Sequence, residues 1–321
     1  MSTLEKTQNL KGRRFLFVVE SSANPSDYRK YEELRKEVWR DLDDTLAGGR
    51  NLANENYFDK GGALFIALYA EDEKKGLNKT REAFVGFSYG FVGVKDKKVG
   101  FNDPDNLIFY SQYLAVRREF QNYGLGVALK EFQRDILLSY FKVNVMTCTF
   151  DPLTGVNANR NIHRFKMDIL AYKESYYEDF RGLLNRKDVP SDRFFVSWDL
   201  TKKAQRKEYD LEQFLVEGHI ALGSEMAEVK GKSGSITLEK TRDVDLTLEH
   251  EFVLIEIPYD YYFMLQETDV EDRSVRDIAV QWRLASRRAF QLYLKRGFRV
   301  VDFQSKKTEE RNRNFYILQR M

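Results

Sequence analysis

The chain has 321 residues, of which 42% are apolar and 32% are charged. At roughly 150 residues per domain this length predicts two domains, each able to bury a core. The 52 basic and 50 acidic residues leave a net charge of +2, so the composition indicates neither a disordered chain nor a protein that binds nucleic acid.

Targeting and metal-binding signals are missing from the sequence. The first fourteen residues contain no apolar leader, and no run approaches the roughly 18 apolar residues of a membrane span. We therefore expect a cytoplasmic protein that does not bind a membrane. Cys148 is the one cysteine, which excludes an internal disulfide and a cysteine-cluster metal site, and we expect it to be buried and inert. His163, His219 and His250 are far apart in sequence, so we expect surface or capping roles for them and no bound metal.

The first two hundred residues alternate between strand-type and helix-type patterns. Alternating or continuous apolar runs predict strands, and apolar residues at helical spacing predict amphipathic helices. The predicted strands are residues 15–20, 64–69, 83–94, 107–116, 143–150 and 194–200. The predicted helices are residues 27–46, with Asp27 as the cap, 127–141 and 157–166. This order predicts an α/β fold.

A turn with Gly124 and Gly126 joins the strand 107–116 to the helix 127–141. Glycine allows the backbone to approach a ligand closely, and the first amides of the helix are unpaired. Such a turn is typical of an anion-binding site, most often for phosphate. A dinucleotide-binding turn needs a small residue where Leu129 stands, and a P-loop needs a lysine where Val127 stands. An ordinary strand-to-helix turn is the remaining alternative.

The six residues of this turn form a recognisable motif. They read Gln-x-x-Gly-x-Gly and resemble the signature of the GNAT superfamily, the coenzyme-A-dependent N-acyltransferases, whose order of strands and helices the chain also follows. The resemblance implies a mixed, splayed central sheet flanked by helices. It also implies that main-chain amides of the turn hold the coenzyme A pyrophosphate, with charge added by Arg117 and Arg118, while the pantetheine arm pairs with the end of the preceding strand. The implied coenzyme A residues are Leu114, Ala115, Val116, Gln121, Asn122, Tyr123, Gly124, Leu125 and Gly126.

Two further segments are similar to one subgroup of predicted GNAT acyltransferases. Residues 150–161 read FDPL-x-x-x-NA-x-x-N, and residues 190–198 read PSDRFFVSW. The subgroup is associated with N-acylation, including N-succinylation, of amino acids. Its helix usually ends in Lys-Leu-Gly, whereas this chain has Arg164-Phe165-Lys166, so the conformation at the end of the helix is an open question.

The implied reaction is attack of a deprotonated amine on the thioester of an acyl-CoA, with protonation of the leaving sulfur. The candidate catalytic residues are Tyr172, Tyr176, Tyr177 and Glu178. Asn157 and Asn159 could bind pantetheine amides or shape a turn. Arg193 could bind a carboxylate of the acceptor or acyl group, or form a structural salt bridge with Asp192. For the tyrosines, packing with hydrated hydroxyl groups is the competing interpretation.

A charged linker, residues 201–210, begins the second region. We predict a GNAT acyltransferase domain at residues 1–200 and a smaller C-terminal α/β region at residues 201–321. Within this region we expect strands at residues 235–240, 252–257 and 299–303, and a long helix at residues 273–296 that stops before Gly297. Residues 289–298 also resemble the second GNAT motif, which allows a degenerate GNAT-like half, but we prefer a simple helix ended by glycine. A half-repeat would complete a sheet, cover the acceptor pocket or form the face of a homodimer.

Two functions follow from these observations. The first is an acyl-CoA-dependent N-acyltransferase that moves an acetyl or succinyl group to the amine of a small molecule or amino acid. Its cosubstrate would be acetyl-CoA or another acyl-CoA, and it would use no metal. The alternative is a catalytically silent sensor or scaffold that binds coenzyme A.

Overall fold

The computed structural model describes residues 4–40, 48–177, 185–204, 207–308 and 311–321. The chain forms two compact units, each with its own buried core. Unit 1 comprises Met1–Cys148 and Asp199–Lys203, and unit 2 comprises Thr149–Trp198 and Ala204–Met321. The domain boundary near residue 200 stays a prediction.

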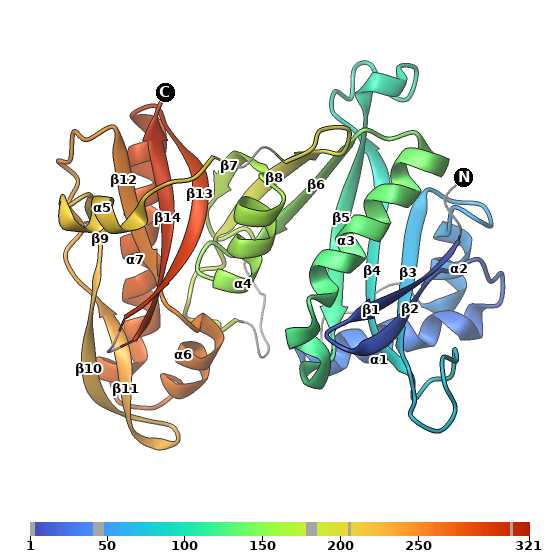
Figure 1. Cartoon of the computed structure of the whole chain (residues 1–321), viewed down its shortest axis with the longest axis horizontal. Coiled ribbons are helices and arrows are strands. Elements are labelled where there is room, and N and C mark those ends of the chain that lie inside the picture. Colours follow the sequence, from blue (N-terminus) through green and yellow to red (C-terminus); the bar gives the residue numbers. More distant parts are fainter. Residues whose placement is uncertain (1–3, 41–47, 178–184, 205–206, 309–310) are drawn as a thin grey trace. The chain divides into compact units, whose positions relative to one another are not determined.

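Unit 1 contains a mixed β-sheet with the strand order β1-β2-β3-β4-β5-β6 (Figure 1). Neighbouring strands are antiparallel except β5 and β6, which are parallel. The strands are β1 (Glu5–Leu10), β2 (Arg13–Val19), β3 (Ala63–Ala70), β4 (Phe84–Val94), β5 (Leu107–Val116) and β6 (Val145–Phe150), the last of which ends in unit 2. The helices are α1 (Arg29–Trp39), α2 (Gly49–Glu55) and α3 (Leu125–Ile136), with a π-turn at Leu137–Phe141 and 3-10 turns at Pro25–Tyr28, Pro104–Asn106 and Arg118–Tyr123.

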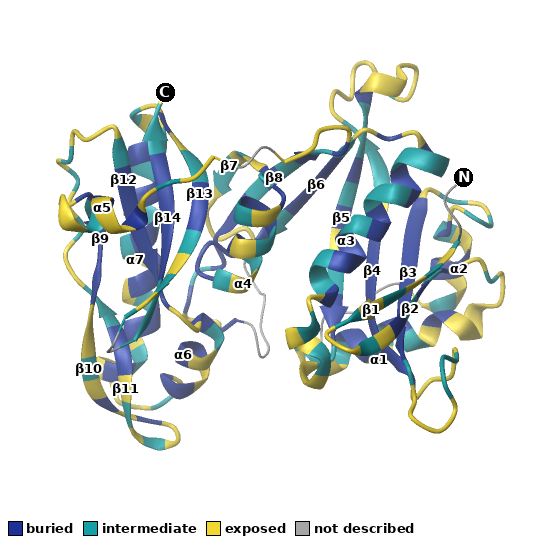
Figure 2. Cartoon of the chain, in the orientation of Figure 1, coloured by how far each residue is buried: buried dark blue, intermediate teal, exposed yellow. Residues whose placement is uncertain are grey.

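Helices cover both faces of this sheet. All eight residues of β3 are buried, as Figure 2 shows by its uniform colour. On one face Tyr31 of α1 contacts Phe65 and Phe84, with ring centroids 5.2 and 5.7 Å apart. On the other, Phe17 of β2 meets Phe132 of α3 at 5.9 Å. Period-2 alternation along the strands supplies apolar side chains to both cores. The predicted fold class, a mixed sheet flanked by helices, is confirmed.

The first helix differs from its prediction. Asp27 does not cap it, because Pro25 starts a 3-10 turn that includes Asp27, and Tyr28 takes the cap position of α1. The helix ends at Trp39, where Arg40 adopts a left-handed conformation with φ 54°. Predicted residues 41–46 lie outside the described residues. Strand β1 and helix α2 were not predicted.

Unit 2 contains two smaller sheets and an antiparallel strand pair. β7 (Asp168–Lys173) pairs with β8 (Arg193–Asp199), β10 (Ser224–Gly231) pairs with β11 (Gly234–Thr241), and a four-stranded sheet has the order β13-β14-β12-β9. The strands of that sheet are β9 (Ile220–Leu222), β12 (Phe252–Ile257), β13 (Phe298–Lys307) and β14 (Asn312–Arg320). The helices are α4 (Gly155–Ala158), which continues as a π-turn at Asn159–Arg164, α5 (Leu211–Val216), α6 (Tyr261–Glu267) and α7 (Arg273–Lys295).

The long helix α7 organises the core of unit 2. Its buried Phe290 lies 4.9 Å from the ring of Phe194 on β8 and 5.1 Å from that of Tyr316 on β14. The helix stops as predicted, with Gly297 in the left-handed region at φ 87° before β13. None of the described helices is long and apolar enough to cross a membrane. The succession of strand, helix and antiparallel strand pair in β12, α7, β13 and β14 is the one a half-repeat would need, but the half-repeat stays a prediction.

The segment Arg164-Phe165-Lys166 keeps the backbone shape that glycine usually supplies. Lys166 adopts φ 50°, so a lysine occupies the left-handed position. Its ammonium group donates to the buried carboxylate of Asp302 at 2.6 Å, and His163 contacts the same oxygen at 2.9 Å. The ion pair fixes the side chain of Lys166 at a position whose backbone conformation costs a non-glycine residue about 1–2 kcal/mol.

The expected surface role is wrong for His219, which is buried, whereas His250 is exposed. The rings of His219 and His250 stack with centroids 4.1 Å apart, and the ring of Phe214 also stacks on that of His219, at 5.3 Å. Burial, and then the neighbouring His250, lower the pKa of His219. Within the described part of the chain no three His, Cys, Asp or Glu side chains gather as a metal site requires. Cys148 is buried and free, as expected.

The stacked histidines predict a pH-dependent stability. Because the folded-state pKa of His219 lies below its unfolded value, the unfolded state binds the proton more readily, and stability is lost as pH falls below about 6.5. Urea unfolding at pH 7.5 and pH 5.5 should show a smaller loss of free energy for His219→Phe, which keeps an aromatic ring, than for the wild type. An equal loss in both proteins would contradict this assignment.

Candidate functional site

The glycine turn between β5 and α3 has the conformation that an anion site requires. Gly124 adopts φ 78° and ψ 14°, the left-handed region, and α3 begins at Leu125. A β-carbon at Gly124 would meet no heavy atom within 4 Å, so backbone conformation, not lack of space, selects glycine here. The open space beside Gly124 lies where a ligand can approach the main chain.

The first amides of α3 are available to such a ligand. The carbonyl of Gly124 accepts from the amides of Val127 and Ala128 at 3.1 and 3.2 Å, which starts the helical ladder. The N–H groups before them have no carbonyl in the helix to bond, and the capping glycine has no side chain to supply an acceptor. Together with the positive end of the helix dipole, they favour an anion at Leu125 and Gly126.

Side chains of the turn anchor it to the sheet. Gln121 donates to the carbonyl of Val116 at 3.3 Å, and the ring of Tyr123 contacts that of Phe15 at 5.4 Å. Leu125 is fully buried, whereas Gln121 and Asn122 are exposed. The buried side chain of Leu125 thus anchors the end of the turn, while Gln121 and Asn122 stay at the surface.

Two arginines precede the turn. Arg118 is exposed, and Arg117 is partly exposed with its Nε 3.3 Å from a carboxylate oxygen of Glu37. Glu37 is half exposed, so this ion pair is partly screened by water and contributes little to stability. Both arginines can therefore add positive charge near the helix terminus.

The edge of β5 next to the turn is open on one side. β5 pairs with β4 as far as Val116, but with β6 only at Phe109 and Tyr110, opposite Met146 and Thr147. A β-bulge interrupts the β4–β5 register after Tyr89. Strand residues direct their main-chain groups alternately to the two neighbours, and within the described strands the segment with Leu114, Ala115 and Val116 has no partner residue on β6. The carbonyl of Val116 accepts from the side chain of Gln121 instead. The expected splay of the sheet is present.

In unit 2, the segment Ser191-Asp192 holds the tyrosine-rich stretch. Ser191 accepts from the amide of Tyr177 at 2.8 Å and donates to its carbonyl at 2.5 Å. Asp192 accepts from the hydroxyl of Tyr172 at 2.6 Å and from the amide of Ser175 at 3.0 Å. Two adjacent side chains therefore fix the backbone on either side of Tyr176.

Asp192 does not form its salt bridge with Arg193. It is fully buried and accepts two hydrogen bonds from the guanidinium of Arg287 on α7, at 2.6 and 2.8 Å. Although burial opposes it, the hydrogen bonds from Arg287 and Ser175 lower the pKa of Asp192. The expected salt bridge between Asp192 and Arg193 is therefore wrong in its partner, because Asp192 pairs with Arg287.

Arg193 binds a different carboxylate. Its Nη1 lies 3.3 Å from Oδ2 of Asp151, which also accepts from Arg283 of α7 at 2.5 Å. The guanidinium of Arg193 lies 5.1 Å from the ring centre of Tyr177, and the residue is 7% exposed. Its role in binding a carboxylate of the acceptor or acyl group stays a prediction.

The candidate catalytic residues have different surroundings. Tyr172 is largely enclosed, and burial raises the pKa of its hydroxyl well above 10. Tyr176 and Tyr177 are 48% and 38% exposed, and the hydroxyl of Tyr177 lies 3.1 Å from that of Thr149. Glu178 lies outside the described residues. Their catalytic roles stay predictions.

Asn157 of α4 and Asn159, which follows α4, also have different surroundings. The side chain of Asn157 donates to Thr154 at 2.9 Å and accepts from Arg160 at 2.7 Å, so it shapes the turn. Asn159 is exposed. A role in binding pantetheine amides stays a prediction for both.

Sequence reasoning missed the partners supplied by α7. Arg283 and Arg287 are four residues apart and therefore lie on one face of the helix, where they meet Asp151 and Asp192. The spacing of the two arginines could have predicted that they share one face of a helix, but no sequence signal indicates which aspartates they meet.

Comparison with known proteins gives structural neighbours only. No family model and no curated protein matches the chain. Among solved structures, it is similar to NAA60 of Arabidopsis thaliana in complex with acetyl-CoA, at 13% identity over 59% of this chain and 99% of that one, with a TM-score of 0.42. It is also similar to the ribosomal-protein-S18-alanine N-acetyltransferase of Escherichia coli, at 12% identity over 60% and 99%, with a TM-score of 0.39. A third is yncA, a putative acetyltransferase of Salmonella typhimurium with acetyl-CoA, at 15% identity over 60% and 98%, with a TM-score of 0.39.

The buried pair of Asp192 and Arg287 should be essential to the stability of unit 2. Arg287→Met leaves the carboxylate buried without its cation and should lower the free energy of unfolding by about 3 kcal/mol. The matched control, Arg288→Met, changes an exposed arginine on the same helix and should cost less than about 0.5 kcal/mol. Chemical denaturation of the three proteins measures both values, and equal effects would show that the pair is not stabilising.

Proposed function

We propose that the chain is an acyl-CoA-dependent N-acyltransferase that transfers an acetyl or related acyl group to an amine. The observation that supports this most is the direct succession, within unit 1, of an open strand edge and an anion-binding helix terminus. A ligand that matches both needs an amide-bearing arm and a phosphate group joined in one molecule. Coenzyme A has this composition, because its pantetheine arm carries two amides and is linked to a pyrophosphate.

In the proposed complex, main-chain groups bind the cosubstrate. The edge formed by Leu114, Ala115 and Val116 would pair with the pantetheine amides as an added strand does. The amides at Gly124, Leu125 and Gly126 would hold the pyrophosphate, assisted by the charge of the two preceding arginines. Main-chain recognition explains why the turn needs its backbone shape more than any particular side chain.

The proposed chemistry is direct aminolysis of the thioester. The neutral amine attacks the carbonyl carbon, the carbon–sulfur bond breaks, and the amine loses a proton while the sulfur leaves as a thiol. Among the described candidates, Tyr176 is the most exposed residue, and we propose that its hydroxyl gives the proton to sulfur. Tyr172 would have to give up its hydrogen bond to Asp192 to do the same.

Binding of coenzyme A can be tested at Gly124. In Gly124→Glu the new side chain carries negative charge into the pyrophosphate position and should abolish binding. Gly12→Glu is the matched control, because Gly12 also has a left-handed φ, 81°, and open space, but lies in the β1–β2 turn. Wild type and control should gain about 1.4 kcal/mol of stability at a coenzyme A concentration tenfold above Kd, measured by thermal denaturation. Binding that survived in Gly124→Glu would refute this placement of the pyrophosphate.

Turnover distinguishes the enzyme from a silent coenzyme-A-binding protein. With acetyl-CoA or succinyl-CoA and a mixture of amines, thiol release should occur only when an amine is present. Release at the same rate without amine would contradict aminolysis, and binding without any release would favour the sensor or scaffold.

If Tyr176 gives its proton to sulfur, loss of its hydroxyl should slow catalysis without weakening the binding of coenzyme A. Tyr176→Phe should lower kcat by about 10- to 100-fold while leaving the Kd for coenzyme A unchanged. Tyr177→Phe provides the comparison on the neighbouring residue. If Tyr176→Phe kept full activity, the assignment of the proton to this hydroxyl would be wrong.

A further inference from the structure

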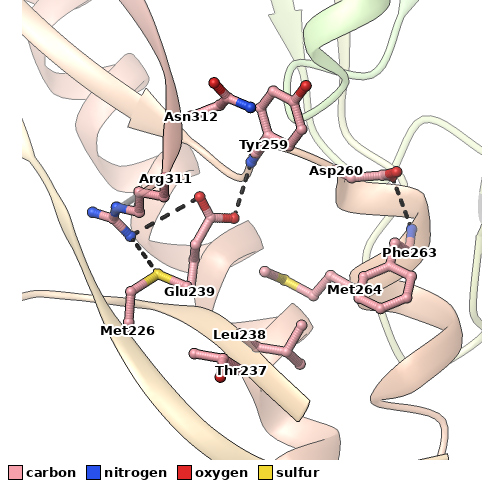
Figure 3. A pocket seen from close by; sticks show the side chains of 10 residues that line it. All are labelled: Met226, Thr237, Leu238, Glu239, Tyr259, Asp260, Phe263, Met264, Arg311 and Asn312. Carbon is pink, nitrogen blue, oxygen red and sulfur yellow. Dashed lines mark hydrogen bonds and ion pairs between the residues drawn. The ribbon is translucent and has the colours of Figure 1, made fainter. Parts of the chain in front are cut away.

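A pocket of about 170 Å³ lies in unit 2 between the β10–β11 strand pair and helix α6 (Figure 3). Met226 and Glu239 are directly opposite each other on the paired strands, and both line the pocket. Tyr259, Phe263 and Met226 are 52%, 44% and 42% exposed, so the pocket has an apolar rim that solvent and ligands can reach. Figure 3 shows the side chain of Met264 pointing toward the same space.

Glu239 brings a buried carboxylate to this pocket. The residue is 8% exposed, and its main-chain carbonyl accepts from the indole of Trp282 at 2.8 Å, which fixes its position. Oε2 accepts from the amide of Tyr259 at 2.9 Å, whereas Oε1 lies 4.0 Å from Nη1 of Arg311. That distance allows an ion pair but is too long for a hydrogen bond, so Arg311 does not donate a hydrogen bond to Oε1.

The guanidinium of Arg311 is engaged elsewhere. It donates to the sulfur of Met226 at 2.9 Å, to the carbonyl of Ser224 at 3.2 Å and to the carboxylate of Glu256 at 3.4 Å. Glu256 is fully buried and also accepts two hydrogen bonds from Arg313, at 2.9 and 2.8 Å. Arg311 and Arg313 therefore both donate to the carboxylate of Glu256, which does not line the pocket.

The charges around the pocket do not balance. Arg311 lines the pocket together with two carboxylates, Glu239 and the exposed Asp260, which caps α6 through the amide of Phe263 at 3.0 Å. These three lining side chains carry one excess negative charge when Glu239 is ionised. The guanidinium of Arg311 stays 4.0 Å from Oε1 of Glu239, so a cation that enters the pocket can donate a charge-assisted hydrogen bond to this oxygen.

We propose that this pocket binds a small organic ammonium ion, with its nitrogen donating to Glu239 and its apolar body against Met264 and Phe263. Aromatic rings and thioether sulfur favour a cation with an apolar body, because the ring faces are negative and the sulfur is polarisable. The site lies within unit 2, and the inference does not depend on the proposed acyl transfer.

The ionisation of Glu239 predicts how binding varies with pH. Burial raises the pKa of Glu239 to about 7, against the lowering effects of the Tyr259 amide and of Arg311. Affinity for an ammonium ion that stays protonated should therefore rise between pH 6 and pH 8, as the carboxylate loses its proton.

Titration calorimetry on the full chain tests the proposal with three small molecules that share a benzene ring and differ in the charge of their polar group. Benzylammonium should bind about tenfold or more tightly than the neutral benzyl alcohol at pH 8, and benzoate should not bind. Glu239→Gln should reduce the affinity for benzylammonium to that for the alcohol. Glu225→Gln, an exposed glutamate of the same strand pair whose side chain points to the opposite face from Met226, should change nothing.

The proposal is overturned if benzyl alcohol or benzoate binds the wild type as tightly as benzylammonium. It is equally overturned if the preference for the cation survives in a folded Glu239→Gln protein. Phe263→Ala provides a second variant, since this exposed residue should be replaceable without unfolding the chain. It should weaken both benzylammonium and benzyl alcohol, and unchanged binding of both would place the ligand elsewhere.

Discussion

The end of hydrogen bonding between β5 and β6 is the constraint on which the candidate site depends. Two residue pairs, Phe109 with Met146 and Tyr110 with Thr147, join the strands, and beyond them the described sheet ladder of β5 continues with β4. The bulge after Tyr89 and the buried aromatic core keep β5 in place despite its open edge. Because only the short 3-10 turn Arg118–Tyr123 separates β5 from the left-handed Gly124 and the terminus of α3, strand-type donors and acceptors are followed closely in sequence by the first amides of the helix.

Unit 2 is stabilised in a different way, by buried charge pairs. Asp151 and Asp192 each receive a guanidinium from α7, and Asp192 also holds the tyrosine-rich segment through Tyr172 and Ser175. A buried pair of this kind contributes less to net stability than it costs to break, so its main effect is to specify one arrangement. The chain thus positions its tyrosines through α7, more than a hundred residues later in sequence.

The sequence predicted the elements whose signals are local. The glycine turn, β5 and the stop of α7 at Gly297 were recognisable because backbone conformation there depends on the residues present. Asp27 was wrongly assigned as a cap because Pro25 shifts the start of the turn, and β7 was missed because it is only half-buried. Asp192 was paired with its neighbour Arg193, although adjacent residues of an extended segment point to opposite sides. Its true partner, Arg287, and the pocket around Glu239 depend on long-range packing that no local pattern encodes.

Hydrogen–deuterium exchange with and without coenzyme A tests the central claim most directly, because it reads main-chain amides. The account predicts slower exchange at residues 114–116 and 124–126 when coenzyme A is added, with no change in the β1–β2 turn around Gly12. Unchanged exchange at residues 114–126 under saturating coenzyme A would contradict it.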